Sequence, residues 1–313
     1  MSQATEQSQR KLVAEDYEWR PQVCPICEIA PTRRLGKRGG LSHRAGLGVE
    51  CEIWRCGRCG LVFPNPMPVP TGGLAQHYEV DADDYFQHHD RDAKSASGHM
   101  FLTQAAELCG RKGRILDIGA GRGELLRAAV EDGWEAVGIE PSAEFARYAT
   151  EYSGAKVIAK RIEDSTFESA SFDVVVLGAV LEHLYNPDEI IREIARILRP
   201  GGVLFVDVPN EAGLYFRLGN LYERIRGRDW VVNLAPTFPP FHVFGFTPHS
   251  LRRLLGKHGL VPTRWRIYGG QALVPSGNNL IGRIEQVAAQ AVTALSRFGS
   301  LGTYIETWAT KTG

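Results

Sequence analysis

The central part of this chain alternates short apolar runs with amphipathic segments, and this alternation constrains the fold more than any other feature. The apolar runs, each followed by a helix-forming segment or a turn, are RILDI, EAVGI, KVI, FDVVVLG and GVLFVDV. FDVVVLG is almost continuously apolar, which is typical of a strand covered on both faces. Strands that alternate with helices predict a parallel sheet with helices on both sides, and so an α/β fold with Rossmann-like architecture.

The first of these strands leads into a glycine-rich loop, Leu116-Asp-Ile-Gly-Ala-Gly-Arg-Gly123. Glycines at 119, 121 and 123 permit a tight turn and the close approach of a ligand. Their G-x-G-x-G spacing differs from the nicotinamide fingerprint G-x-G-x-x-G. Asp117 disfavours a pyrophosphate, and Glu140 ends the next strand where an acid holds ribose hydroxyls. The pattern predicts a nucleoside with a positively charged tail, which S-adenosylmethionine matches.

Five of the six cysteines fall between residues 24 and 59, in a chain whose start has no apolar signal-peptide core. This clustering favours a metal site over disulfides. The pairs Cys24-Pro-Ile-Cys27 and Cys56-Gly-Arg-Cys59 have the spacing of zinc ligands, and two such turns complete a tetrahedral site. Four thiolates leave no open position, so we expect structural Zn²⁺ in a zinc ribbon, with Cys51 as a spare buried thiol.

The chain is predicted to have four segments and one insertion. The predicted segments are a flexible tail (1–20), a zinc ribbon (21–63), a linker or lid (64–98) and an α/β domain (99–313). The boundary rests on Pro64-Asn-Pro-Met-Pro-Val-Pro70, a helix-free stretch. Residues 210–246 break the strand–helix rhythm and are too long for a simple loop, which predicts a structured substrate cap. An apolar helical stripe over 280–298 is expected to be core or a homodimer contact, with membrane association as an alternative.

Here the sequence resembles the class I S-adenosylmethionine-dependent methyltransferases, in the branch with an amino-terminal zinc ribbon that is associated with sugar and polysaccharide biosynthesis. The matching segments are CGLVFPNP, ILDIGAGRGELL, VGIEPS, SFDVVVLGAVLEHLYNP, ILRPGGVLFVDVPN and FHVFGFTPHSLRRLLGKHGL. The resemblance implies a seven-stranded sheet whose last strand, GTYIETWATK, runs antiparallel. It also implies a cofactor site whose residues are Asp117, Gly119, Ala120, Gly121, Glu140, Pro141, Ile162, Glu163, Gly178 and Val180. In it, Asp117 and the glycines line the methionine portion, Glu140 takes the ribose, and Ile162 and Glu163 flank the adenine.

The segment Leu181-Glu182-His183 is similar to the ubiquinone O-methyltransferase group, where two acids and a histidine bind a divalent ion. Ala179 stands at the upstream acid position here, so that ligand set is incomplete. Glu182 and His183 are therefore expected to hold the loop.

Methyl transfer from a sulfonium needs mainly alignment of the reacting atoms, although a sugar hydroxyl also needs a base. His183 and His242 are the candidate catalytic bases, and His242 lies among aromatic residues that would exclude water. A histidine bonded to backbone is an equal alternative for His242. Four arginines nearby could clasp a phosphate or carboxylate, or form a solvated helix face: Arg217, Arg224, Arg226 and Arg228.

The net charge of the chain indicates which kinds of binding partner to expect. The 36 basic and 36 acidic residues cancel, which argues against nucleic acid, and the basic ribbon is expected to be compensated by the acids of residues 79–92. No stretch reaches the roughly 18 apolar residues that span a bilayer, so a cytoplasmic location is expected. The favoured function is methylation of a hydroxyl or amine on a small-molecule acceptor, sugar-linked, lipid-linked or phosphorylated. The alternatives are an RNA methyltransferase and a non-catalytic binding subunit.

Overall fold

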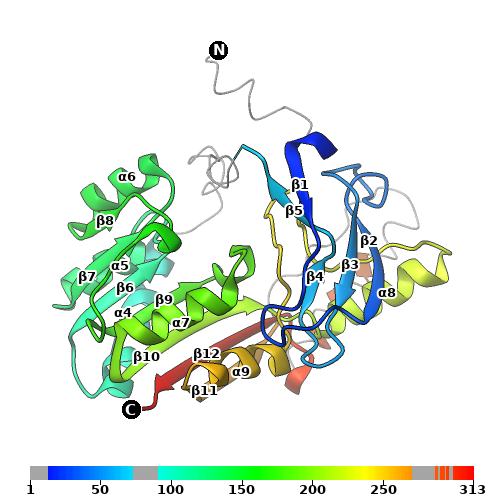
Figure 1. The fold of residues 1–313 in the computed structure, drawn as a ribbon. Helices are drawn as coiled ribbons and strands as arrows, with labels where there is room; N and C mark the ends of the chain where they lie inside the picture. The colour runs from blue at the N-terminus through cyan, green and yellow to red at the C-terminus, as the bar shows by residue number, and fades with distance from the viewer. Residues whose placement is uncertain (1–12, 73–90, 270–285, 288–289, 293, 296–298) are drawn as a thin grey trace.

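The computed structural model describes residues 13–72, 91–269, 286–287, 290–292, 294–295 and 299–313 (Figure 1). Most of the predicted lid, and most of the 280–298 stripe with its expected dimer contact, lie outside these described residues. The acids from Glu79 to Asp90 that were expected to compensate the ribbon also lie outside them.

The α/β domain is built on a seven-stranded sheet with the order β11-β12-β10-β9-β6-β7-β8. Its strands are β6 (Arg114–Ile118), β7 (Glu135–Ile139), β8 (Lys156–Ile158), β9 (Phe172–Gly178), β10 (Leu198–Pro209), β11 (Leu260–Tyr268) and β12 (Tyr304–Lys311). Strands β6 to β10 pair in parallel, and β12 is antiparallel to both β10 and β11. The predicted Rossmann-like sheet with an antiparallel last strand is confirmed.

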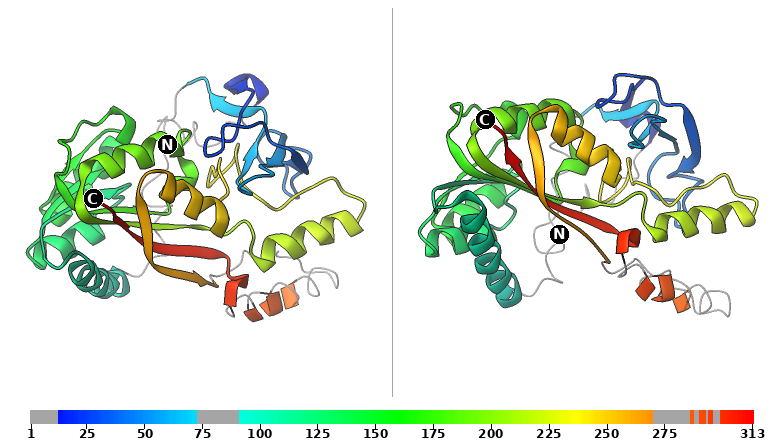
Figure 2. Two further views of the ribbon diagram at one scale, coloured as in Figure 1. Left: turned by 60° about the horizontal axis from the view of Figure 1, so that its bottom comes forward. Right: turned by 90° about the horizontal axis from the view of Figure 1, so that it is seen from below.

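Helices cover both faces of the sheet because alternate residues of each buried strand point to opposite sides (Figure 2). The helices are α4 (Arg91–Cys109), α5 (Glu124–Glu131), α6 (Ala143–Ser153), α7 (Pro187–Ile197) and α9 (Pro248–Lys257). Ile115 of β6 packs in the cluster that contains Leu102 of α4, whereas its neighbour Leu116 packs in the cluster with α7 and α9. Thr247 caps α9, where its side chain accepts a hydrogen bond from the amide of Ser250.

The N-terminal module, residues 13–72, contains two small sheets. One is antiparallel and consists of β2 (Arg33–Arg38), β3 (Cys51–Arg55) and β4 (Val62–Pro64). The other pairs β1 (Tyr17–Arg20) with β5 (Met67–Pro70). Residues 17–20 therefore do not belong to a flexible tail, and the proline-rich stretch is not simply a linker. Tyr17 is only 4% exposed, and β5 tolerates its prolines because a two-stranded sheet consists of edge strands.

The insertion over residues 210–246 contains helix α8 (Leu214–Ile225) and then packs against the N-terminal module. Isolated bridges join Lys37 to Trp230 and Val62 to Gly245. Arg34 forms an ion pair with Asp229 at 2.6 Å, so the insertion supplies an acidic partner for the basic ribbon. The segment therefore connects the N-terminal module to the large sheet, in addition to any role over a substrate.

Candidate functional site

The glycine loop follows β6 at the carboxyl edge of the sheet, where ligands of open α/β sheets bind. The amides of Gly119 and Ala120 both donate to the carbonyl of Ile139, at 2.8 and 3.0 Å, which turns the loop towards β7. Gly119 has φ +77°, and a Cβ there would lie 2.6 Å from Val180 Cγ2. A Cβ on Gly123 would lie 3.1 Å from Ala149 Cβ of α6. These two glycines thus serve close packing within the protein as well as the turn.

Glu140 stands at the end of β7 and fixes the loop. Its Oε2 accepts from the amide of Gly121 and its Oε1 from that of Ser142, both at 3.0 Å. The residue is 7% exposed, and burial raises the pKa of its carboxyl. Each carboxylate oxygen keeps a further lone pair, so Glu140 can still accept bonds from two hydroxyl groups of a ligand.

Asp117 lies beside Glu140, and nothing in the described residues neutralises it. It is 7% exposed, and burial, followed by the charges of Glu140 and Glu124, raises the pKa of its carboxyl to about 7. A cationic group bound here would relieve this repulsion. The pocket therefore suits a ligand that carries a cation and ribose hydroxyls, and S-adenosylmethionine passes this test.

The other predicted cofactor residues follow neighbouring strands at the same edge. Pro141 succeeds Glu140, and Gly178 ends β9. Val180 packs against Gly119, as described above. Ile162 and Glu163 belong to the short helix η2 (Ile162–Asp164), in which Ile162 is buried and Glu163 is exposed.

Glu182, His183 and His242 meet on the far side of β9 from β6, next to β10. Glu182 and His183 form part of helix η3 (Leu181–His183), and His242 comes from the end of the insertion. The rings of the two histidines are 4.8 Å apart and nearly perpendicular, and His242 Nε2 lies 3.8 Å from Glu182 Oε1. The amides of Val243 and Phe244 donate to the Glu182 carbonyl at 3.0 and 3.1 Å, which brings these distant segments together.

Burial sets the protonation of this cluster. Glu182 is 1% exposed, and neither of its carboxyl oxygens has a hydrogen-bond partner among the described residues. Burial raises the pKa of Glu182 to about 8 and lowers the pKa of His183 to about 4 and that of His242 to about 3. At neutral pH both imidazoles are therefore unprotonated, and each keeps a nitrogen lone pair, although the low pKa makes each a weak base while Glu182 is uncharged. A buried carboxyl without a hydrogen-bond donor is unusual for a residue whose role is only structural.

The same three side chains could hold a divalent cation. Their ligand atoms all lie within 4.8 Å of one another, and one carboxylate with two neutral imidazoles is a usual donor set. Ala179 adds no ligand. His242 provides the third group, which sequence inspection of the loop alone could not supply.

Sequence inspection missed Asp207 of β10, the strand next to β9, and Tyr268 at the end of β11. Asp207 pairs in register with Gly178, and the hydroxyl of Tyr268 donates to its Oδ2 at 2.9 Å. Burial raises the pKa of Asp207 to about 6, and its Oδ1 has no partner in the described part of the chain. A single acid within the apolar run GVLFVDV was the signal available for it.

The four predicted zinc ligands come together in the N-terminal module. Cys24, Cys27, Cys56 and Cys59 are buried, and their sulfur atoms lie within 4.8 Å of one another. Each Cys-x-x-Cys turn is closed by a backbone hydrogen bond to the carbonyl of its first cysteine. The amide of Glu28 donates to Cys24, and the amide of Gly60 donates to Cys56. This position has positive φ in both turns, 59° at Glu28 and 79° at Gly60, so the unusual glutamate adopts the glycine conformation. Cys51 lies outside the cluster, and burial raises the pKa of its thiol to about 12.

Within the described residues, no helix has the length and apolar character needed to cross a bilayer.

Comparison with known proteins identifies the family of this fold. A profile described as "Methyltransferase domain" matches residues 86–264, more than half of the chain. A ubiquinone biosynthesis O-methyltransferase of Bordetella avium is 30% identical over 168 residues, covering 52% of this chain and 67% of the relative. That of Cupriavidus pinatubonensis is 27% identical over 214 residues, with 64% and 83% covered. The mitochondrial protein of Mus musculus is 36% identical over 157 residues, which is 47% of this chain and 41% of that protein.

Solved structures are similar to this chain at lower sequence identity. A SAM-dependent methyltransferase from Archaeoglobus fulgidus matches with 18% identity and a TM-score of 0.49, over 73% of this chain and 97% of that one.

The buried carboxyl of Glu182 should make stability depend on pH. Its pKa in the folded protein, about 8, lies above the ordinary value of 4.5, so the folded state retains a proton that the unfolded chain releases. This contribution to the free energy of unfolding is complete below about pH 4.5 and is lost as the pH rises towards about 8. Glu182→Gln should make the dependence shallower by this one contribution, whereas Glu151→Gln at an exposed position of α6 should leave it unchanged. Urea denaturation across this range measures the effect, and equal pH profiles for wild type and Glu182→Gln would contradict it.

Proposed function

This chain belongs to the methyltransferase domain family as a class I S-adenosylmethionine-dependent enzyme, and we propose that it methylates a hydroxyl or amine of a small-molecule acceptor. The acceptor is a sugar-linked or lipid-linked biosynthetic intermediate. The observation that carries this proposal is the buried cluster of Glu182, His183 and His242 at the same sheet edge as the glycine loop. Such a cluster can accept a proton, which a hydroxyl acceptor requires and an amine does not. The relatives named as O-methyltransferases favour the hydroxyl.

The acids at the glycine loop bind and orient the cofactor in this proposal. When bound, S-adenosylmethionine supplies a methyl group activated by a sulfonium. The ionised Asp117 pairs with its ammonium, and Glu140 accepts hydrogen bonds from the ribose hydroxyls. Ile162 and Glu163 flank the adenine, while Ala120, Gly121, Pro141, Gly178 and Val180 complete the walls.

His242 is the preferred base, with His183 as the second candidate. His242 is 21% exposed on its side chain, so it can meet an acceptor while its ring remains largely shielded from water. A proton taken by its imidazole gains a counter-charge when Glu182, 3.8 Å away, is ionised. Because Glu182 ionises near pH 8, turnover of a hydroxyl acceptor should rise with pH through that region.

The N-terminal module binds one structural zinc through Cys24, Cys27, Cys56 and Cys59. Four thiolates fill a tetrahedral shell, so this ion stabilises the module and takes no part in the reaction.

The first prediction concerns cofactor binding. A cationic ligand binds the ionised form of Asp117, so the affinity for S-adenosylmethionine should fall by up to about tenfold per pH unit below pH 7. Asp117→Asn should weaken binding and flatten this dependence. Methylthioadenosine, which lacks the ammonium, is the matched ligand, and its affinity should vary far less with pH. Calorimetric titration measures both, and the same pH dependence for the two ligands would refute the role of Asp117.

The second prediction concerns the base. With a hydroxyl acceptor, His242→Ala should lower turnover by roughly 10²–10⁴-fold, because a general base is lost. Its affinity for S-adenosylmethionine should stay close to wild type, and the loss should be much smaller with an amine acceptor. Transfer of a radiolabelled methyl group to a panel of phenols, sugars and amines measures this. Wild-type turnover in both His242→Ala and His183→Ala would exclude histidine base catalysis, and methylation of no small molecule would overturn the proposed function.

The third prediction concerns the metal. Elemental analysis of protein purified without chelators should find one zinc per chain, and Cys56→Ser should lose it and unfold the module, because so small a core needs the metal. Cys51→Ser is the control, since Cys51 lies outside the cluster, and it should retain zinc. Wild-type protein without stoichiometric zinc would rule out the site.

A further inference from the structure

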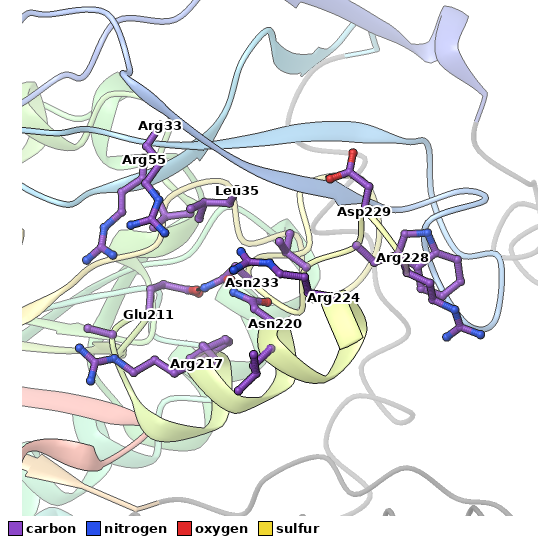
Figure 3. A pocket seen from close by; sticks show the side chains of 16 residues that line it. Arg33, Leu35, Arg55, Glu211, Arg217, Asn220, Arg224, Arg228, Asp229 and Asn233 are labelled. Carbon is purple, nitrogen blue, oxygen red and sulfur yellow. Dashed lines mark hydrogen bonds between the residues drawn. The ribbon is translucent and has the colours of Figure 1, made fainter. Parts of the chain in front are cut away.

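A second cavity of about 390 Å³ lies between the N-terminal module and helix α8, apart from the glycine loop (Figure 3). Five arginines line it, which are Arg33, Arg55, Arg217, Arg224 and Arg228. Figure 3 shows Arg33 and Arg55 reaching in from strands of the module and Arg217 from α8. Two acids, Glu211 and Asp229, also line this arginine pocket, so its charge depends on how those acids are paired.

Both acids already accept hydrogen bonds, Asp229 from outside the pocket and Glu211 from a residue that lines it. Asp229 accepts two hydrogen bonds from Arg34, at 3.0 and 2.6 Å, and Arg34 does not line the pocket. Glu211 accepts a hydrogen bond from Asn233, which in turn accepts one from Asn220 at 2.6 Å. Burial raises the pKa of Glu211 to about 7, so it carries only part of a charge at neutral pH.

Four of the five arginines have no acidic side chain of the described residues at ion-pair distance. Within the described residues, Arg33, Arg55, Arg217 and Arg224 form no ion pair. Burial first, and then the charges of Arg33 and Arg217, lower the pKa of Arg55, so these three guanidinium groups lie close enough to repel one another. The charges of Cys59 and Glu211 oppose this effect without reversing it. Arg228 is held over the ring of Trp230, at 4.4 Å, and by Glu223. Repelling guanidinium groups gathered around a cavity form an anion site, because planar guanidinium forks match phosphate oxygens.

The arginine pocket is connected to the reaction site by a short segment. Glu211 at its floor donates its amide to the Phe246 carbonyl at 2.8 Å, and a Cβ on Gly245 would meet the Glu211 side chain. Three residues before Gly245 stands His242, whose neighbours Val243 and Phe244 bond to Glu182. The arginine pocket and His242 therefore adjoin the same short backbone segment.

We propose that the arginine pocket binds the phosphate or diphosphate group of the methyl acceptor, which makes the acceptor a phosphate ester. The assignment of this anion to the acceptor rests on the proposed function, whereas the anion site itself rests on the pocket alone. A nucleotide and a polyprenyl chain are the two carriers that could supply a diphosphate. Both present the same group to the arginines.

Calorimetry on the full chain with inorganic diphosphate tests the site. Wild-type protein should bind it with an affinity that falls as salt rises, and Arg217→Gln should weaken binding roughly ten- to hundredfold through one lost charge-assisted contact. Arg217 is exposed on α8, so its replacement should not unfold the protein, and Arg55→Gln gives a second, half-buried test. Arg192→Gln and Arg253→Gln, at exposed positions of α7 and α9, are matched controls that should bind as wild type.

Uridine diphosphate and farnesyl diphosphate distinguish a nucleotide carrier from a polyprenyl carrier. The carrier is identified by whichever of the two binds more tightly than inorganic diphosphate. No diphosphate binding by wild type, or unchanged binding in both Arg217→Gln and Arg55→Gln, would overturn the site. Binding of S-adenosylmethionine in the same samples separates this result from the proposed function. One outcome is that methyl transfer to an uncharged acceptor proceeds equally well in Arg217→Gln and wild type while phosphate esters are not methylated. That result would overturn the role of the pocket in acceptor binding and would leave the proposed methyltransferase function intact.

Discussion

The bonds that the carbonyl of Glu182 accepts from the amides of Val243 and Phe244 determine how the rest of the molecule is arranged. They attach the end of the insertion to the carboxyl edge of the large sheet, and the adjacent bridge from Gly245 to Val62 attaches the N-terminal module to the same segment. Without these contacts His242 would not approach Glu182, and the arginines of the module would not face α8. Both sites therefore depend on a few backbone hydrogen bonds that no side-chain pattern encodes.

Features that are local in sequence were predictable. The residues around the loop from Leu116 to Gly123 indicate a strand, a turn and a helix within a short stretch. Each of the two Cys-x-x-Cys turns provides half of the ligands of a metal site. The antiparallel β12 followed from the resemblance and is confirmed by its pairing with β10 and β11. Such signals survive because backbone conformation, glycine φ and ligand spacing are set by neighbours along the chain.

Contacts between distant segments were not predictable from one sequence. The pairing of Tyr17–Arg20 with Met67–Pro70 was missed, because four residues with mixed polarity give no strand signal and prolines argue against one. His242 was singled out for its aromatic neighbours, but its partner Glu182 was assigned to holding the loop. Arg33 and Arg55 were read only as part of a basic ribbon, since nothing local indicates that α8 faces them.

Electrostatics divides the molecule in a way that its zero net charge conceals. At the glycine loop, Asp117 and Glu140 are acids whose pKa values are raised by burial and, for Asp117, also by the neighbouring charges of Glu140 and Glu124. In the arginine pocket the charge imbalance is positive, because Asp229 accepts hydrogen bonds from Arg34 and Glu211 accepts one from Asn233. Each cluster of like charges is destabilising by itself, so a ligand of opposite charge at either site would stabilise the folded protein. The proposed cationic cofactor at one site and the proposed anionic acceptor at the other would each supply that opposite charge.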